Sequence, residues 1–277
     1  MQRSHFRSIF ISDVHLGTRD CRADYLLDFL RHTRCERLYL VGDIIDLEAL
    51  ARAPYWPPLH GRVLAELLEM ARSGTRVTYL PGNHDAPLRG LHGQAIGGIE
   101  VRLRTEHTCA DGRRLRISHG DEFDPAQLGR TWLTWLGERA HRALCAANRA
   151  VNALRRRLDL PYLPLSILAK GRFGQALDYI QRFEALAAAR ARGEGFDGQV
   201  CGHIHFGNLR EVDGTLYLND GDWVEHCTAL VEHADGSLEL LHWNGAAASL
   251  GRVRAQAALG LPRSEERRVG KECMPVC

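Results

Sequence analysis

Short apolar runs alternate with helical patterns at the start of the chain, and this alternation limits the folds that the chain can adopt. Strand-length runs rich in Ile, Val, Leu and Tyr occupy residues 9–12, 38–41 and 77–80. Between them, apolar residues recur at helical spacing in two groups: Tyr25, Leu26, Phe29 and Leu30, then Val63, Leu64, Leu67, Leu68 and Ala71. This order favours parallel strands, because a crossover helix returns the chain to the same end of a sheet. The opening therefore predicts an α/β fold with strands buried on both faces.

The later strand-length runs are connected differently. They occupy residues 115–118, 200–201, 216–218, 228–231 and 238–242. The turn sequences Val212-Asp-Gly214 and Ala234-Asp-Gly236 directly precede two of them. Asp-Gly pairs are typical of tight hairpins, so antiparallel pairs are expected here. We therefore predict a mixed α/β sandwich rather than a purely parallel sheet.

Residues 125–192 break this rhythm. From Leu128 to Leu158, apolar residues recur every three to four positions with arginines between them, which predicts one long amphipathic helix. A second periodic run from Phe173 to Ala187 predicts another helix. We interpret residues 125–192 as a helical cap inserted into a catalytic domain that consists of residues 1–124 and 193–245.

Positive charge is concentrated in this insertion. The whole chain has a net charge of only +2, whereas residues 125–192 hold twelve Lys or Arg against four acidic residues. Two interpretations stay open. The arginines form an ordinary solvated helix face, or they meet anionic groups such as lipid headgroups or a pyrophosphate.

Composition also bears on the compartment of the protein. The eight cysteines sit singly, without a Cys-x-x-Cys pair, which favours reduced thiols. The chain enters a strand-like run soon after Met1, and no segment approaches the roughly 18 apolar residues of a membrane span. We therefore expect a cytoplasmic protein. Residues 246–277 lack periodicity and are predicted to be a disordered tail, or one foreign to the domain.

Five short motifs carry the side chains suited to chemistry: Asp13-Val-His15, Gly42-Asp43-x-x-Asp46, Gly82-Asn83-His84-Asp85, His119-Gly-Asp121 and Gly202-His203-Ile-His205. All but the bare His119 begin where an apolar run ends, so the polar side chains should collect at one sheet edge. Alternate residues of a strand share a face, so Asp13 and His15 should reach one ion. A carboxylate can bridge two cations, a role that we assign to Asp43. Imidazoles, an amide and a shared carboxylate fit Mn, Fe or Zn better than Ca or Mg.

Together these motifs resemble those of the calcineurin-type metallophosphoesterases, over roughly residues 8–243. The resemblance implies an enzyme with a four-layer α/β/β/α sandwich, two mixed sheets and two divalent metal ions. It implies ligands for a first ion: Asp13, His15, Asp43 and His205. It implies ligands for a second ion: Asp43, Asn83, His119 and His203. Two such ions supply hydroxide and clamp phosphoryl oxygens, so the implied reaction is hydrolysis of a phosphoric ester or anhydride.

The third motif also offers catalytic candidates. His84 directly follows the candidate ligand Asn83 and cannot easily bind a metal beside it. We therefore expect His84 to meet the phosphate or to protonate the leaving oxygen, and Asp85 to orient the His84 ring and raise its basicity. Asp46 is expected to hold a loop or to support a ligand.

Further segments are similar to the UDP-2,3-diacylglucosamine pyrophosphatase group of bacterial lipid A synthesis: Ser12–Gly17, Val41–Asp46, the helical cap, and Asn219-Asp-Gly-Asp-Trp223. The similarity implies hydrolysis of UDP-2,3-diacylglucosamine to UMP and 2,3-diacylglucosamine 1-phosphate. The cap would receive the acyl chains of this nucleotide-sugar lipid, and peripheral contact with inner membrane lipids would follow. Ser166 and Lys170 are candidate contacts to the sugar phosphate.

One departure from that group puts the substrate in doubt. The group carries Arg where this chain has His84. The alternative is a phosphodiesterase or phosphatase that acts on another small nucleotide or lipid phosphoester. A nuclease would be expected to have further domains and a base-stacking surface, and a non-catalytic module would lack ligands. The sequence shows no further domain and no base-stacking surface, so no nucleic-acid partner is expected. No candidate ligand is missing, which argues against a non-catalytic module. The oligomeric state stays open.

Overall fold

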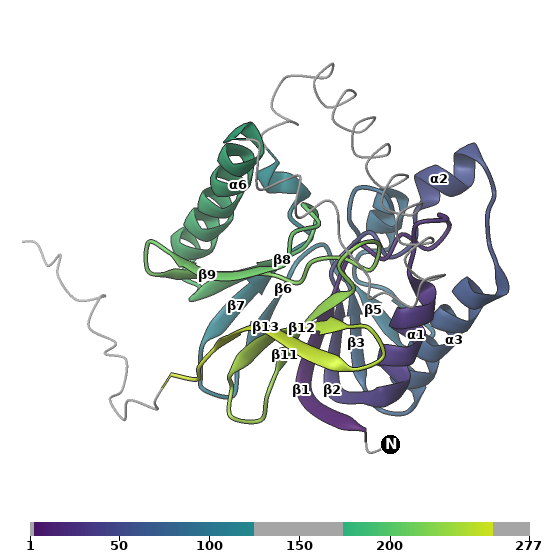
Figure 1. Ribbon diagram of the computed structural model, residues 1–277, viewed down its shortest axis with the longest axis horizontal. Helices are drawn as coiled ribbons and strands as arrows, with labels where there is room; N and C mark the ends of the chain where they lie inside the picture. The colour runs from purple at the N-terminus through teal and green to yellow at the C-terminus, as the bar shows by residue number, and fades with distance from the viewer. Residues whose placement is uncertain (1–2, 125–173, 257–277) are drawn as a thin grey trace, which may run out of the picture.

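Two β-sheets pack face to face in this protein, with helices on both outer faces (Figure 1). The computed structural model describes residues 3–124 and 174–256. Within these ranges, one sheet has eight strands in the order β13-β12-β11-β1-β2-β3-β5-β4. The other has five strands in the order β6-β7-β8-β10-β9. The two sheets are called the eight-stranded and the five-stranded sheet below.

The eight-stranded sheet is mixed. Parallel pairing joins β1 (Ser4–Ile11), β2 (Thr33–Leu40), β3 (Arg76–Tyr79) and β5 (Ile99–Val101). Antiparallel pairing adds β4 (Ala95–Ile96), β11 (Thr228–Glu232), β12 (Leu238–Trp243) and β13 (Ala247–Val253). The predicted parallel opening and the predicted hairpin at residues 234–236 are therefore both confirmed.

The five-stranded sheet is also mixed. Its centre is parallel and contains β7 (Arg114–Ile117), β8 (Gly198–Cys201) and β10 (Thr215–Asn219). Its edges are antiparallel and are formed by β6 (Thr105–Thr108) and β9 (Asn208–Val212). The hairpin predicted around Asp213-Gly214 joins β9 to β10, as expected from the turn sequence.

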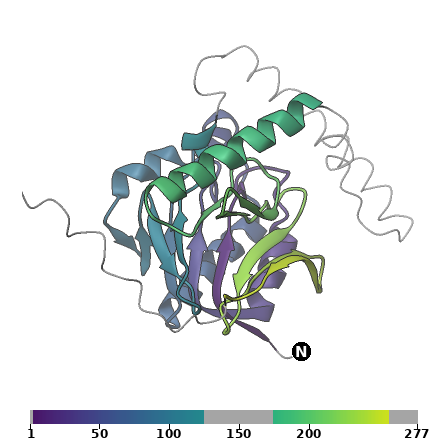
Figure 2. The same cartoon turned by 90° about the vertical axis from the view of Figure 1, so that its left-hand side faces the viewer.

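Helices form the two outer layers. The outer face of the eight-stranded sheet is covered by α1 (Ala23–His32) and α3 (Pro58–Arg72), and that of the five-stranded sheet by α6 (Gly174–Gly193) (Figures 1 and 2). The short helices α2 (Leu47–Arg52), η1 (Ala86–Leu91) and η2 (Asp121–Phe123) lie in the connecting loops. In the part of the chain that the structure describes, no helix combines the length and apolar character needed to span a membrane.

Three clusters of buried apolar side chains fill the spaces between the four layers of helices and sheets. Side chains of β1 alternate between two of these clusters: Ile9 and Ile11 pack with the helices, and Phe10 packs between the sheets. All three side chains are fully buried. A third cluster, with Phe183 and Ala187 of α6, covers the outer face of the five-stranded sheet. The predicted α/β/β/α sandwich with two mixed sheets is therefore confirmed.

Two predicted boundaries differ from the structure. Residues 174–192 were assigned to the cap, yet α6 packs on β8, β9 and β10 as an outer layer of the sandwich. The tail was predicted to be disordered from residue 246, yet Ala247–Val253 form β13 along β12. Periodicity identified a helix at α6 but could not say which surface it covers. The predicted long helix at 128–158 and most of the tail lie outside the described residues.

The packing of α6 can be tested by removing its largest buried side chain. Phe183 is fully buried and makes edge-on ring contacts with Phe123 and Tyr217. We expect Phe183→Ala to lower the free energy of unfolding by about 3 to 5 kcal/mol, because the cavity cannot be refilled. Leu186→Ala is the matched control, since Leu186 lies on the same helix and is 45% exposed. Urea unfolding measures the free energy of unfolding of both variants. If α6 were a detachable cap, both substitutions would lower this free energy by the same small amount.

Candidate metal centre

Five loops meet where parallel strands end. They follow β1, β2 and β3 of one sheet and β7 and β8 of the other, and each carries one of the five motifs. The carboxyl ends of parallel strands face the same edge of a sheet, so their loops come together. Backbone hydrogen bonds join the loops: the Asp13 amide donates to the Gly42 carbonyl at 3.0 Å, and the Gly202 amide donates to the His119 carbonyl at 3.0 Å.

The first group of candidate ligands surrounds His205. Its Nε2 lies 3.2 Å from Asp13 Oδ1 and 3.4 Å from His15 Nε2. His15 Nε2 in turn lies 3.9 Å from Asp13 Oδ1 and 4.0 Å from Asp43 Oδ2. The structure thus brings together all four residues that were predicted to hold the first ion.

The second group surrounds His119 and adjoins the first. His119 Nε2 lies 3.3 Å from Asp43 Oδ2 and 3.2 Å from Asn83 Oδ1. His203 Nδ1 lies 3.0 Å from the same Asn83 oxygen. All four residues predicted for the second ion are therefore neighbours, and Asp43 belongs to both groups.

The chemistry of these donors fits two cations. Asp13 and Asp43 are almost completely buried, and Asp13 Oδ1 has no hydrogen bond. Burying carboxylates together is costly without positive charge beside them. His119 Nδ1 donates to the Val41 carbonyl at 2.8 Å, which leaves its Nε2 facing the Asp43 carboxylate. Burial opposes ionisation of Asp43, but the His119 and His15 rings outweigh it and hold the Asp43 pKa well below its ordinary value.

Most of the candidate ligands occupy left-handed backbone conformations. The φ angle is positive at Asp13 (49°), His15 (52°), Asp43 (53°), His203 (69°) and His205 (50°). Such conformations cost energy in residues other than glycine and gather at functional sites. Strand alternation, the reason given for Asp13 and His15 reaching one ion, therefore does not apply, since β1 ends at Ile11. The two side chains still reach one site, because the turning backbone aims them there.

Two motif glycines are required by close approach of the ligands. A Cβ atom on Gly82 would lie 2.7 Å from His119 Nε2 and still closer to Asp43 Oδ1. A Cβ atom on Gly202 would collide with Ser12 and Asp13. The Gly-Asn and Gly-His pairs of the motifs therefore leave room for ligand side chains that arrive from other loops.

His84 lies beside the ligand groups rather than within them. Its Nδ1 is 3.2 Å from Asp46 Oδ2, an ion-pair contact that is not aligned as a hydrogen bond, and its side chain is 29% exposed. Its backbone amide donates to Asp43 Oδ1 at 2.8 Å. Burial lowers the His84 pKa, but the carboxylates of Asp46, Asp43 and Glu48 outweigh this effect and raise the pKa to about 9. The ring is therefore protonated at neutral pH in the metal-free protein.

Asp46, and not Asp85, contacts the His84 ring, so the expectation that Asp85 orients it is wrong. Asp85 is fully buried and accepts hydrogen bonds from the Ile44 amide (2.9 Å), the Gly82 amide (2.5 Å) and the Tyr79 hydroxyl. It therefore joins the loops of the second and third motifs. Burial and the nearby Asp43 carboxylate raise the Asp85 pKa.

Asp46 has the two tasks expected of it. Its Oδ1 accepts from the Ala49 amide at 2.6 Å and caps α2, while its Oδ2 accepts from His15 Nδ1 at 3.0 Å. A ring that donates from Nδ1 to a carboxylate keeps its Nε2 oriented toward a metal. Sequence reasoning thus recognised the residue but not its contact with His84.

Two supporting carboxylates were missed by sequence reasoning. Asp124 Oδ2 lies 3.1 Å from His203 Nε2, and Asp222 Oδ2 lies 3.7 Å from His205 Nδ1. Asp222 is in the Asn219–Trp223 motif, which was a signal for it, whereas no motif marked Asp124. Ser166 and Lys170, the predicted sugar-phosphate contacts, lie outside the described residues.

Two clusters of imidazole, amide and carboxylate donors that share a buried carboxylate are suited to bind divalent metal ions. The sequence profile described as calcineurin-like phosphoesterase matches residues 6–207 of the chain. The protein therefore belongs to the calcineurin-like phosphoesterase family and is a metal-dependent phosphoesterase.

The chain is also similar to individual relatives and to solved structures. The chain is 23% identical over 222 residues to the UDP-2,3-diacylglucosamine hydrolase of Serratia proteamaculans (strain 568), covering 79% of this chain and 80% of that protein. It is 30% identical over 122 residues to a protein of the same name from Ralstonia nicotianae, covering 40% and 42%. The E. coli phosphoesterase Yfce has 15% identity and a TM-score of 0.47, covering 90% of this chain and 99% of that chain.

The close packing at Gly82 leads to a test of the centre. We expect Gly82→Ala to bind less than one metal ion per chain, because the added methyl group displaces His119 and Asp43. Gly90→Ala is the control, since a methyl group there meets no atom within 4 Å. Metal content after Mn loading and gel filtration, measured by mass spectrometry, reports the loss. Saturating metal should stabilise the control by about 2.7 kcal/mol for each bound ion at a hundredfold excess over Kd, and the variant by much less.

Proposed function

We propose that this chain hydrolyses the pyrophosphate bond of UDP-2,3-diacylglucosamine and releases UMP and 2,3-diacylglucosamine 1-phosphate. The two ligand groups that share Asp43 support the reaction type, because they fit two neighbouring cations. The similarity to two proteins named UDP-2,3-diacylglucosamine hydrolase supports the substrate. Under this proposal the enzyme acts in lipid A synthesis.

We propose Mn as the metal, with Fe or Zn as alternatives. The donors in both groups are imidazole nitrogens and carboxylate or amide oxygens, a set that suits these ions. Asp13, His15, Asp43 and His205 would hold one ion, and Asp43, Asn83, His119 and His203 the other. When bound, the ions supply hydroxide at neutral pH and neutralise charge on the phosphoryl oxygens.

His84 is our candidate for direct contact with the phosphate. Its ring is 29% exposed beside the ligand groups, and the carboxylates of Asp46, Asp43 and Glu48 favour its protonated form. It can therefore donate a hydrogen bond to a phosphoryl oxygen or transfer a proton to the leaving oxygen. Asp46 Oδ2 lies 3.2 Å from Nδ1 of the ring. Asp85 acts only through the loops that it joins.

The alternative is a phosphodiesterase or phosphatase for another small nucleotide or lipid phosphoester. His84 favours this alternative, because the pyrophosphatase group that the chain resembles carries Arg at the corresponding position. Both reactions use the same ligand groups. They differ in the part of the substrate that lies away from the scissile bond.

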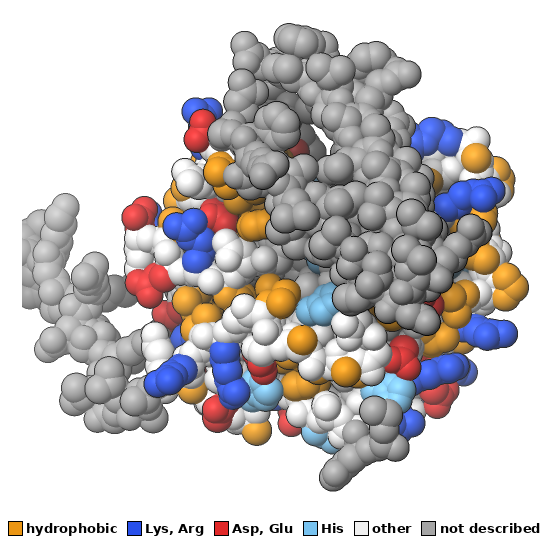
Figure 3. All heavy atoms as spheres, in the orientation of Figure 1, with side chains coloured by type: hydrophobic (Ala, Val, Ile, Leu, Met, Phe, Trp, Pro, Cys, Tyr) orange, Lys and Arg blue, Asp and Glu red, His pale blue; other side chains and the backbone are white. Residues whose placement is uncertain are grey.

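The proposed partners follow from the substrate. A nucleotide-sugar lipid would place the enzyme at the cytoplasmic face of the inner membrane, with peripheral contact through its cap. A nucleic-acid partner is not proposed. Both basic and acidic side chains of the described residues are present on the face shown in Figure 3.

The substrate is tested by direct comparison of esters. Mn-loaded protein is mixed in detergent with UDP-2,3-diacylglucosamine, bis-p-nitrophenyl phosphate or a cyclic nucleotide. We expect UMP release with a kcat/KM at least about a hundredfold above that for the generic esters, because binding of the remote groups favours the correct substrate. Equal or absent turnover of the lipid substrate would instead support the alternative.

The role of His84 is tested separately. We expect His84→Ala to keep its bound metal and to lose about 100-fold or more in kcat, because a proton donor is removed while the ligands stay. His84→Arg restores a positive charge and should recover part of the activity on the pyrophosphate substrate. Unchanged kcat in His84→Ala, at equal metal content, would contradict the assignment.

A further inference from the structure

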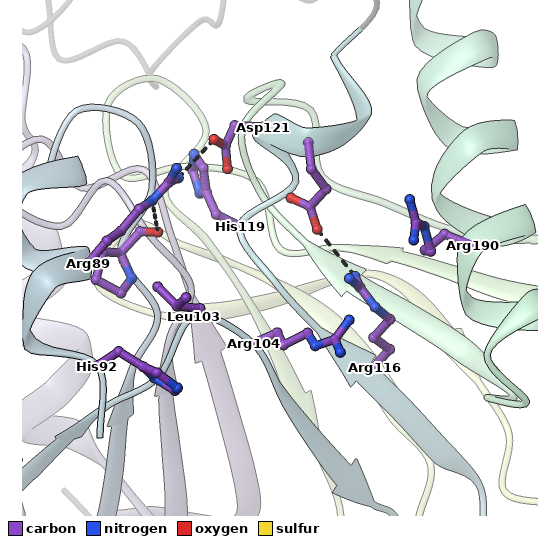
Figure 4. A pocket seen from close by; sticks show the side chains of 10 residues that line it. Arg89, His92, Leu103, Arg104, Arg116, His119, Asp121 and Arg190 are labelled. Carbon is purple, nitrogen blue, oxygen red and sulfur yellow. Dashed lines mark hydrogen bonds and ion pairs between the residues drawn. The ribbon is translucent and has the colours of Figure 1, made fainter. Parts of the chain in front are cut away.

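A pocket of about 590 Å³ opens beside the metal centre, on the side of His119. Four elements line it: the loop before η1 and η1 itself, the β5–β6 loop, the segment from β7 into η2, and α6. Its lining residues are Pro81, Arg89, His92, Leu103, Arg104, Arg116, His119, Asp121, Glu122 and Arg190. Figure 4 shows Arg89 near His119 at one end, and Arg104, Arg116 and Arg190 at the other. A pocket of this volume holds a ligand of nucleotide size.

Two of the four arginines have firm partners within the protein. Arg116 is almost buried and contacts Ser118 (2.8 Å), Gln199 (2.9 Å) and Glu194 (3.1 Å). Arg89 donates to Asp121 at 2.8 Å. These contacts hold both guanidinium groups against the protein, so we regard Arg116 and Arg89 as parts of the pocket wall.

Arg104 and Arg190 are placed differently. Each lies near the single carboxylate of Glu194, at 3.6 Å and 3.5 Å, and Arg116 contacts the same carboxylate more closely. One carboxylate therefore faces three guanidinium groups. The side chains of Arg104 and Arg190 are 64% and 58% exposed, so their planar donors face the pocket solvent. Two exposed guanidinium groups that share one carboxylate keep donors free to bind a further oxyanion.

We propose that Arg104 and Arg190 bind a phosphate-class anion that the substrate carries away from its scissile phosphate. The scissile phosphate belongs at the ligand groups, and the pocket continues from His119 toward the two arginines. Leu103, 46% exposed, offers an apolar surface within the same pocket for the part of the ligand between the two anionic groups. This assignment rests on the phosphoesterase activity and not on the lipid substrate. UDP-2,3-diacylglucosamine carries no phosphate apart from its pyrophosphate, so the second anion would belong to a substrate of the alternative class, a small phosphoester with a further phosphate group.

The test uses two substrates that differ in one remote group. Thymidine 5′-(p-nitrophenyl phosphate) has a single phosphodiester, and its 3′-phosphorylated derivative carries a second anion. In the Mn-loaded full chain at low salt, we expect the 3′-phosphate to raise kcat/KM about tenfold, as expected for charge-assisted hydrogen bonds. In Arg104→Ala/Arg190→Ala, and in the corresponding glutamine pair, we expect the ratio of the two kcat/KM values to fall to about one.

Matched variants separate this site from general charge effects. Arg72→Ala/Arg192→Ala removes two exposed arginines outside the pocket and should keep the tenfold ratio. Arg104→Lys/Arg190→Lys should give a ratio between one and ten, because the positive charge remains but the planar guanidinium group is lost. A ratio near one in the unaltered protein would overturn the proposal. So would a tenfold ratio that survives in Arg104→Ala/Arg190→Ala. Neither result depends on turnover of UDP-2,3-diacylglucosamine, so the two proposals fail independently.

Discussion

The buried carboxylate of Asp43 is the constraint around which the rest of the site is arranged. It lies 4.0 Å from His15 Nε2 and 3.3 Å from His119 Nε2, and so links the two ligand groups. Its other oxygen accepts the His84 amide at 2.8 Å. A carboxylate that is only 2% exposed needs positive charge on several sides. The imidazoles supply it in part, and two divalent cations would complete it.

The sandwich serves this constraint by bringing five loops to one edge. Parallel strands in both sheets end there, and helices on the outer faces keep the strands dry. The loops then leave regular structure, and Asp13, His15 and Asp43 adopt left-handed conformations. Strained residues persist only where neighbours hold them, and here backbone hydrogen bonds and buried carboxylates such as Asp85 do so. Stability elsewhere in the sandwich thus supports the strained centre.

Much of this could be predicted from local patterns. The apolar runs identified eight strands but not β4, β5, β6, β9 and β13, and the Asp-Gly turns predicted the hairpins. The motifs identified all seven ligand candidates that the structure gathers. Local patterns did not predict contacts between side chains that are far apart in the sequence. Asp85 follows His84 in the sequence, but contacts Ile44, Gly82 and Tyr79 instead of the His84 ring. Likewise, the periodicity of α6 showed an apolar face without showing that the five-stranded sheet covers it.

By itself, the sequence determined the succession of strands and helices in the first part of the chain, the donor types and hence the class of reaction. These properties depend on the side-chain period of each element and on which residues follow each strand, and both are local. Only the tertiary structure decided that Asp46 meets His84 and that Arg104 and Arg190 face one pocket. Such contacts join residues from separate elements. Their partners are chosen by sheet pairing and core packing, which depend on the whole chain at once.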